Sequence, residues 1–193
     1  MKKLMEQMAE ELSAAFEKAG YDPSYGKVTV SNRPDLCEFQ CNGAMAGAKA
    51  YKKAPFMIAD DVVAYLKDSK VFSMAEVVKP GFINLKVNGE FLADYLKEMA
   101  EQGLLLEEMT PLKYIFREDE PQHLRYRIEE LEHAPTDEER AEYAKDGWQE
   151  VCHYELDYVF AKECSADEPE VSQEAVLRDL DKKIEKEKGS IRE

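Results

Sequence analysis

The chain has 193 residues, of which 44% are hydrophobic and 35% charged, and this composition is typical of a globular protein rather than a disordered one. Its formal net charge of −15 argues against indiscriminate binding to nucleic acid or to anionic membranes. Residues 109–193 have a net charge of −11 and residues 1–108 only −4, so the first half can still present a local basic face.

Residues 1–6 contain a carboxylate where a secretory signal needs an apolar run, and no apolar stretch approaches the ~20 residues that a membrane helix requires. We therefore expect a cytoplasmic protein without membrane contact. Its four cysteines, Cys37, Cys41, Cys152 and Cys164, include no Cys-x-x-Cys pair. This spacing predicts reduced, buried thiols and neither a metal site nor another cofactor.

Hydrophobic periodicity in the first half predicts a helix, two strands, two helices, two strands and a helix, in that order. The expected ranges are 5–18, 27–31, 38–40, 43–52, 55–66, 71–78, 82–87 and 89–102. Alanine and glycine dominate the helix over 43–52, and small side chains let a helix approach its neighbour closely. A Lys79-Pro80-Gly81 turn joins the two strands of the expected hairpin.

The second half predicts a smaller unit of two strands, a helix and two strands, after a boundary at residues 104–111. Thr136 and Glu139 form a capping box for the helix, which begins there and ends near Gly147. The sequence thus predicts an α+β protein with two small domains, each an antiparallel sheet with helices, and a charged C-terminal helix. The expected bounds are 1–103, 112–165 and 171–193.

Polar side chains concentrate in residues 32–42, where a turn containing Pro34 leads into a short strand and then a helix. Asn32, Gln40 and Asn42 place amides at the strand edge and at the expected start of the helix, where backbone N–H groups bind anions. Gln40 and Asn42 are equally explained as a strand-edge hydrogen-bonding group and a helix cap.

This stretch resembles the N-terminal additional domain of arginyl-tRNA synthetases, whose pattern is Phe-Gly-Asp-Tyr-Gln-x-Asn followed by a helix of small residues. The residues that carry the resemblance are Pro34-Asp35-Leu36-Cys37-Glu38-Phe39-Gln40-Cys41-Asn42, with Ala44-Met45 and Ala48-Lys49 after them. Pro55 with Ile58-Ala59 matches the next helix, and Pro80-Gly81-Phe82-Ile83-Asn84-Leu85 matches the family's later turn and strand. The resemblance covers roughly residues 1–102.

The resemblance implies a module that docks on the elbow of tRNA, near the D-loop, through this corner of the fold. Phe39, Gln40 and Asn42 stand at matching positions, so a base would stack on Phe39 while the amides read its edge. Asn32 lies at the same corner. Phosphate contacts would come from five cations: Lys27, Arg33, Lys49, Lys52 and Lys53.

Two departures from the family are evident. Leu36-Cys37-Glu38 replaces Phe-Gly-Asp, and the three histidines fit no synthetase nucleotide-binding signature, so the catalytic body is missing and we expect no enzyme activity. The second half is similar to a bacterial domain family of unknown function, which adds no chemistry.

The leading hypothesis is a non-catalytic adaptor or regulator that binds structured RNA. It would bind tRNA best, including tRNAs that accept arginine, and its acidic second half would contact a protein partner. The rival hypothesis is a protein–protein interaction module that kept the fold and lost the RNA; an enzyme of unknown type is a third. Convergence of the five cations with few carboxylates would favour RNA. Neutralisation of those cations by Asp35 and Glu38 would favour the interaction module.

Overall fold

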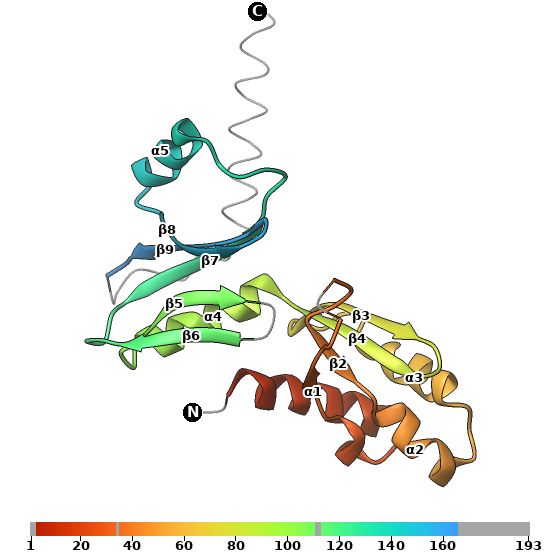
Figure 1. Cartoon of the computed structure of the whole chain (residues 1–193). Helices are drawn as coiled ribbons and strands as arrows, with labels where there is room; N and C mark the ends of the chain where they lie inside the picture. The colour runs from red at the N-terminus through yellow and green to blue at the C-terminus, as the bar shows by residue number, and fades with distance from the viewer. Residues whose placement is uncertain (1–2, 34, 111–112, 166–193) are drawn as a thin grey trace, which may run out of the picture.

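The computed structural model describes residues 3–33, 35–110 and 113–165, and the expected helix over 171–193 lies outside these residues, as does Pro34. The described residues form five α-helices, a short 3-10 helix and three antiparallel sheets (Figure 1). The predicted α+β class of small sheet-and-helix units is confirmed.

The first half contains one four-stranded sheet with the strand order β1-β2-β4-β3. Its elements are α1 (Leu4–Lys18), η1 (Pro23–Tyr25), β1 (Thr29–Val30), β2 (Phe39–Cys41), α2 (Gly43–Tyr51), α3 (Pro55–Val63), β3 (Phe72–Val78) and β4 (Phe82–Val87). The predicted order of elements is confirmed. The strand expected over 27–31 is shorter, because only Thr29 and Val30 pair with β2.

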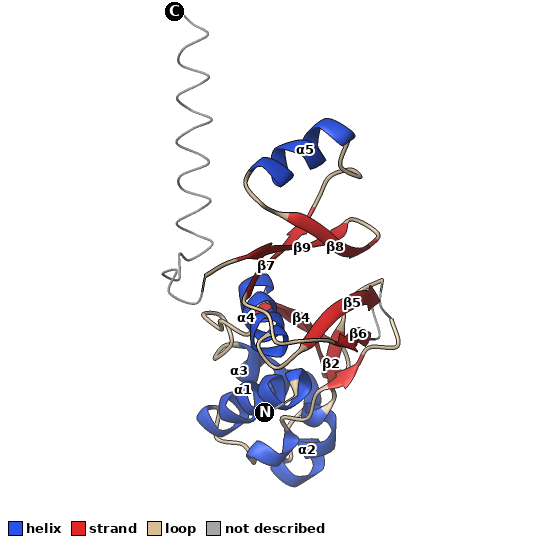
Figure 2. Cartoon of the chain, turned by 90° about the vertical axis from the view of Figure 1, so that its left-hand side faces the viewer, coloured by secondary structure: helices blue, strands red, loops and turns tan. Residues whose placement is uncertain are grey.

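The three helices lie on the same side of this sheet (Figure 2) and bury one face of it. Phe39 and Cys41 of β2 and Ile83 and Leu85 of β4 point into this core, each no more than 5% exposed. From the helices, fully buried side chains complete the core: Met8, Leu12, Phe16, Ile58 and Val62. Since side chains alternate along a strand, the opposite face of the sheet carries Gln40 and Asn84.

The second half contains a two-stranded sheet, β5-β6, and a three-stranded sheet, β7-β9-β8. Its elements are α4 (Gly89–Ala100), β5 (Leu104–Thr110), β6 (Lys113–Glu118), β7 (Leu124–Glu130), α5 (Asp137–Lys145), β8 (Gln149–Tyr154) and β9 (Asp157–Glu163). The capping box of Thr136 and Glu139 at the start of α5 is confirmed.

Residues 104–110, which lie in the expected boundary at 104–111, form strand β5 and pair with β6. The physical reason is the burial of Leu105 and Leu106, which are 5% and 4% exposed. Helix α4 packs against β7 and β5. Helix α4 and strand β5 thus pack on elements of the second half. The bounds of independently folding domains stay a prediction.

The small residues of α2 allow a close approach to the segment that ends η1. A Cβ atom on Gly43 would lie 1.9 Å from the carbonyl oxygen of Tyr25, and one on Gly47 would lie 3.2 Å from the Tyr25 ring. Tyr25 in turn packs near Phe16 of α1, with ring centroids 6.3 Å apart. The glycine at the start of α2 is therefore required by packing against a backbone atom, which cannot move aside cheaply.

We expect Gly43→Ala to lower the free energy of unfolding by about 1–3 kcal/mol, because the added methyl group overpacks this contact. Gly89→Ala is the matched control, since Gly89 is likewise the first residue of a helix and its Cβ would meet its nearest neighbour at an ordinary 3.7 Å. Urea denaturation measures both variants. Equal stability of the two would contradict the packing argument.

Candidate nucleic-acid interface

The open face of the first sheet carries a pair of amide side chains at its centre. Gln40 and Asn84 lie directly opposite each other on β2 and β4, and Gln40 Nε2 donates a hydrogen bond of 2.9 Å to Asn84 Oδ1. Asn84 is only 5% exposed, while Gln40 is half-buried. Gln40 Oε1 and Asn84 Nδ2 form no further hydrogen bond with the described residues, so the pair has one acceptor and one donor left. The exposed Glu76 of β3 lies directly opposite Asn84 on the same face.

Asn84 was missed as a site residue by reasoning from the sequence. The sequence pattern that could have identified Asn84 is an amide between two apolar strand residues, Ile83 and Leu85, which the structure shows to be fully buried. The pairing with Gln40 spans 44 residues of sequence, and only the register of β2 against β4 brings the two side chains together.

The expected stacking of a base on Phe39 is incompatible with this structure, because Phe39 is 5% exposed and belongs to the hydrophobic core. Adjacent residues of a strand point to opposite faces, so Phe39 and Gln40 do not face the same ligand. Half-exposed Phe82 lies on the amide face instead, two residues before Asn84.

Asn42 stands at the N-cap position of α2, but its side chain makes no capping hydrogen bond, which corrects the expectation of a side-chain cap. The backbone there has φ −113° and ψ 14°, outside the extended conformation that directs a cap side chain toward the helix. Asn42 and Asn32 are both exposed. Their amides remain available to a ligand, as far as the described residues go.

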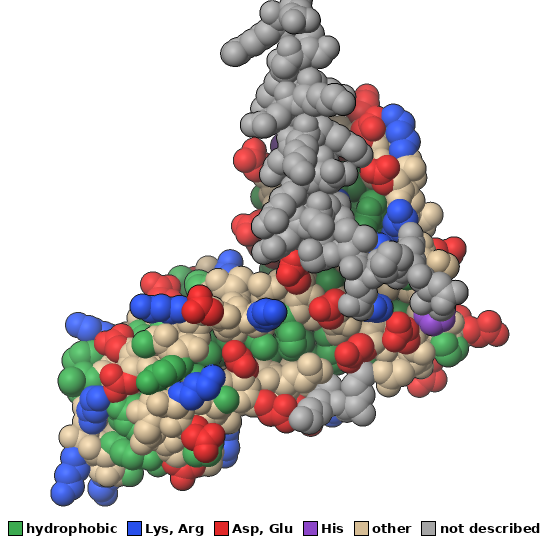
Figure 3. Space-filling model, turned by 180° about the vertical axis from the view of Figure 1, so that it is seen from behind, with side chains coloured by type: hydrophobic (Ala, Val, Ile, Leu, Met, Phe, Trp, Pro, Cys, Tyr) green, Lys and Arg blue, Asp and Glu red, His purple; other side chains and the backbone are tan. Residues whose placement is uncertain are grey.

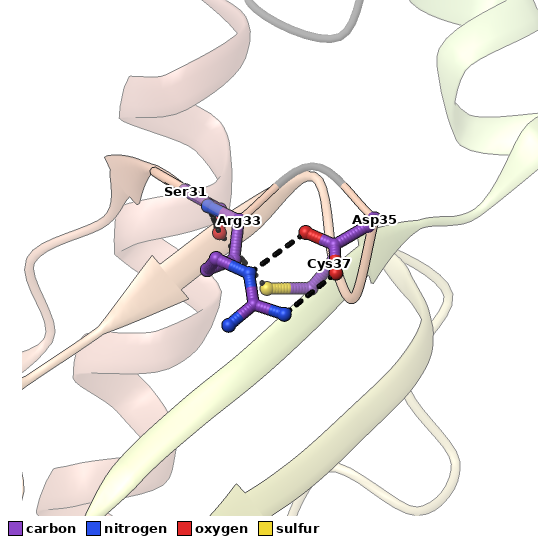
Figure 4. Close-up of polar contacts among 4 residues, drawn as sticks. All are labelled: Ser31, Arg33, Asp35 and Cys37. Carbon is purple, nitrogen blue, oxygen red and sulfur yellow. Dashed lines mark hydrogen bonds and ion pairs between the residues drawn. The ribbon is translucent and has the colours of Figure 1, made fainter.

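The turn after β1 is held by local polar contacts (Figure 4). The Arg33 guanidinium donates two hydrogen bonds to Asp35, at 2.9 and 2.7 Å, and Ser31 Oγ accepts from the Arg33 N–H at 3.0 Å. The Cys37 thiol also donates to Ser31 Oγ, at 3.3 Å. The guanidinium holds the pKa of Asp35 below its usual value, so Asp35 neutralises Arg33 as a phosphate-binding group.

The five predicted cations divide into paired and unpaired groups. Arg33 is paired with Asp35, and Lys53 forms an ion pair with Asp61 while donating to the Tyr21 hydroxyl at 3.0 Å. Three others are exposed and have no ion pair with any described residue: Lys27, Lys49 and Lys52. Glu38 neutralises none of the five, because its carboxylate accepts a hydrogen bond of 2.9 Å from the Val87 N–H.

Charge is locally reversed at the end of the molecule formed by α2, α3 and the β3–β4 turn. Residues 43–63 and 72–82, which contain α2, α3 and this turn, have four lysines against three carboxylates, Asp60, Asp61 and Glu76, and Asp61 is paired with Lys53. Figure 3 shows blue and green side chains with some red ones among them at its left end, and red ones more frequent toward the right. A chain of net charge −15 thus has a basic end.

Glu38 lies at the side of the sheet that faces the second half. Burial raises the pKa of its carboxyl, and the nearby Asp157 raises it further, while the hydrogen bond from the Val87 N–H and the nearby Lys86 act in the opposite direction. Burial likewise raises the pKa of the Cys41 thiol to about 11, so this thiol stays protonated and unreactive at neutral pH. Among the described residues, no three His, Cys, Asp or Glu side chains come together to hold a metal ion.

The second half contains a cavity of about 470 Å³ between the β5–β6 hairpin and the β7-β9-β8 sheet. Its floor is apolar, with Leu105, Leu106 and Tyr126, and its polar lining includes Arg117 and Lys162. None of the predicted site residues lines this cavity. Within the part of the chain that the structure describes, no helix has the length and apolar character needed to cross a bilayer.

The fold and the open amide-bearing sheet define a small α+β module joined to a second α+β unit. Residues 2–87 match the arginyl tRNA synthetase N terminal domain, which confirms the resemblance found in the sequence. Residues 91–190, more than half of the chain, match the family described as "Protein of unknown function (DUF2812)". The chain belongs to this second family and carries the synthetase N-terminal domain in front of it.

The chain is similar to arginine–tRNA ligases of bacteria over its first half. It is 59% identical over 101 residues to the ligase of Agathobacter rectalis, a match that covers 52% of the chain and 17% of that ligase. It is 50% identical over 109 residues to the ligase of Alkaliphilus oremlandii, covering 56% of the chain and 19% of the ligase. The chain therefore spans about a fifth of the length of these curated relatives.

Among solved structures, the crystal structure of arginyl-tRNA synthetase from Plasmodium falciparum matches with a TM-score of 0.41 and 19% identity. This match covers 56% of the chain and 20% of that synthetase.

The raised pKa of Glu38 makes a prediction about stability and pH. A raised pKa means that the folded protein favours the protonated carboxyl, so stability is lost as pH rises from the ordinary value of 4.5 through the folded pKa. Glu38→Gln keeps an acceptor for the Val87 N–H and carries no charge. We expect it to unfold at a higher temperature than the wild type at pH 7, with the difference vanishing near pH 4.

Thermal unfolding followed by circular dichroism between pH 4 and pH 7 measures this difference. Glu118→Gln, which removes an exposed carboxylate on β6, is the matched control and should show a much smaller dependence on pH. A Glu38→Gln variant that is less stable than the wild type at pH 7 would refute the burial argument.

Proposed function

We propose that this protein is a non-catalytic, cytoplasmic adaptor or regulator that binds tRNA through its first half. The observation that carries the proposal is the 59% identity with an arginine–tRNA ligase across 101 residues, or 17% of that enzyme, together with the match of residues 2–87 to the arginyl tRNA synthetase N terminal domain. The geometry of the open sheet face and the basic end of the molecule supports the same function.

The amide pair supplies the chemistry of base recognition. Gln40 Oε1 accepts and Asn84 Nδ2 donates, and these two groups side by side match the edge of an unpaired base. The exposed amide of Asn42 lies two residues further along the same strand edge. Half-exposed Phe82, on the same face, takes the stacking role that buried Phe39 does not fill.

The unpaired lysines supply the contacts to phosphates. Lys49 and Lys52 project from the end of α2, and Lys27 follows η1, which packs against α2. Phosphate contacts position a nucleic acid, and base contacts specify it, so the two sets act together. Since the rest of the chain is acidic, RNA is repelled from other surfaces and is directed to this end.

The second half takes no part in RNA binding in this proposal. Its net charge of −11 over residues 109–193 disfavours a polyanion and suits a protein partner. The adaptor thus joins a tRNA-binding module to a unit that contacts another protein.

Two ion pairs favour the rival function, a protein–protein interaction module that no longer binds RNA. Arg33 and Lys53 are held by Asp35 and Asp61 and are less available to phosphates. A binding measurement separates the two functions, because only the RNA function requires affinity for tRNA at low salt.

We expect the purified protein to bind a tRNA pool that includes arginine acceptors, with an affinity that falls linearly in log salt. The Lys49→Ala/Lys52→Ala double variant should bind roughly 25–60-fold more weakly at 0.1 M salt, because two phosphate contacts are lost. Its salt slope should be shallower by about 1.4–1.8. Fluorescence anisotropy across a salt titration measures both quantities.

The matched control is Lys113→Ala/Lys145→Ala, which removes the same charge from exposed positions of the second half. It should leave the affinity and the salt slope unchanged. Absence of tRNA binding at low salt would refute the proposed function and leave the protein–protein module in its place.

A further inference from the structure

The tip of the first half exposes apolar side chains beside a lysine. Phe56, Met57 and Val78 are 38%, 45% and 36% exposed, and Lys79 Nζ lies 5.6 Å from the centroid of the Phe56 ring. We call these four residues the tip patch. Exposed apolar side chains scattered singly need no explanation, but a contiguous group with a cation is typical of a binding surface.

The exposure of Phe56 and Met57 follows from their place on α3. The residues that this helix buries are Ile58, Ala59 and Val62, whereas Phe56 and Met57 follow Pro55 in the first turn, off the buried stripe. Neither side chain is needed to fill the core. Pro55 stabilises this end of the helix, because proline suits the first helical position.

A glycine brings Lys79 to the Phe56 ring. A Cβ atom on Gly81 would lie 2.5 Å from Pro55 Cβ and 2.8 Å from its carbonyl carbon, so only glycine lets the β3–β4 turn rest against the start of α3. Segments more than 20 residues apart in sequence thereby form one surface. The tip patch is a product of this contact, not of either segment alone.

The tip patch continues the open face of the sheet. Val78 pairs with Phe82 in the β3–β4 hairpin, and Asn84 lies two residues further along β4, on the same face as Phe82. A ligand that contacts the Gln40–Asn84 pair can therefore extend along β4 to the tip.

The lysines around the tip patch favour a polyanion as its occupant. Residues 43–63 and 72–82, which form this end, have four lysines and three carboxylates, and because Lys53 is paired with Asp61, three lysines remain against Asp60 and Glu76. Lys52 and Lys79 are exposed, and the blue side chains in this region are visible at the left end of Figure 3. An aromatic ring bordered by lysines is the arrangement with which proteins bind unpaired nucleotides, since bases stack on the ring and lysines contact the backbone.

We propose that the tip patch is a second RNA contact, in which an unpaired base stacks on Phe56 and Lys79 binds the adjoining phosphate. This inference rests on the proposed function and adds a sequence-tolerant contact to it, because every base has a face that can stack. The existing contact of Lys79 with Phe56 is no obstacle. An exposed lysine–aromatic contact contributes less than base stacking, and the lysine side chain is free to turn toward a phosphate.

The test compares variants of the full chain for binding to the same labelled tRNA pool. Phe56→Ala should weaken binding by at least about fivefold with an unchanged salt slope, because a stacking contact releases no counterion. Phe56→Tyr keeps a stacking ring and should bind as the wild type does. Lys79→Ala should weaken binding and reduce the salt slope by about 0.7–0.9.

Tyr65→Ala is the matched control, because Tyr65 is an aromatic residue 52% exposed just after α3 and outside the tip patch. It should not change the affinity. Thermal unfolding of each variant shows whether it is folded, and Lys79→Ala, which alters an exposed turn residue, tests the inference if Phe56→Ala does not fold.

Wild-type affinity in both Phe56→Ala and Lys79→Ala would overturn the tip patch as an RNA contact. If Lys49→Ala/Lys52→Ala still weakened binding in that case, the proposed function would stand and the tip patch would belong to a protein partner. Absence of tRNA binding by the wild type would overturn both.

Discussion

Strand β4 is the element on which the arrangement of the first half depends. It pairs with β2 on one edge and β3 on the other, so every side chain of its central residues points to one of two faces. Ile83 and Leu85 are fully buried beneath the helices, and Asn84 between them must therefore lie on the open face. The alternation of side chains along β4 thus determines both which residues enter the core and where the amide pair lies.

The distribution of charge explains how an acidic chain can carry the RNA-binding surface that we propose. Charges separated by more than about 8 Å are largely screened at physiological salt, so a ligand at the basic end is affected mainly by the lysines nearest to it. At low ionic strength, where the screening length is longer, the net charge of −15 also acts on the ligand and favours the approach that presents this end. This charge distribution would orient a bound RNA on the protein and would add little to its affinity.

The second half places a different fold directly after a synthetase-type module. Helix α4 packs on β5 and β7, so the first residues after the synthetase match belong structurally to the unit that follows. That unit contains the cavity lined by Arg117, Lys162 and apolar residues of β5. Burial of the Leu105–Leu106 pair against the sheets makes β5 part of its core.

Four features were predictable from the sequence: the order of elements in the first half, the α+β class, the capping box of α5 and the relation to arginyl-tRNA synthetases. These depend on local periodicity, end signals and motif spacing, which are all contained in short stretches. The tertiary structure alone decided that Phe39 is buried, that Gln40 pairs with Asn84, and that Gly81 brings Lys79 to Phe56. Periodicity shows which side chains share a face, but which face is covered depends on contacts between segments far apart in the chain.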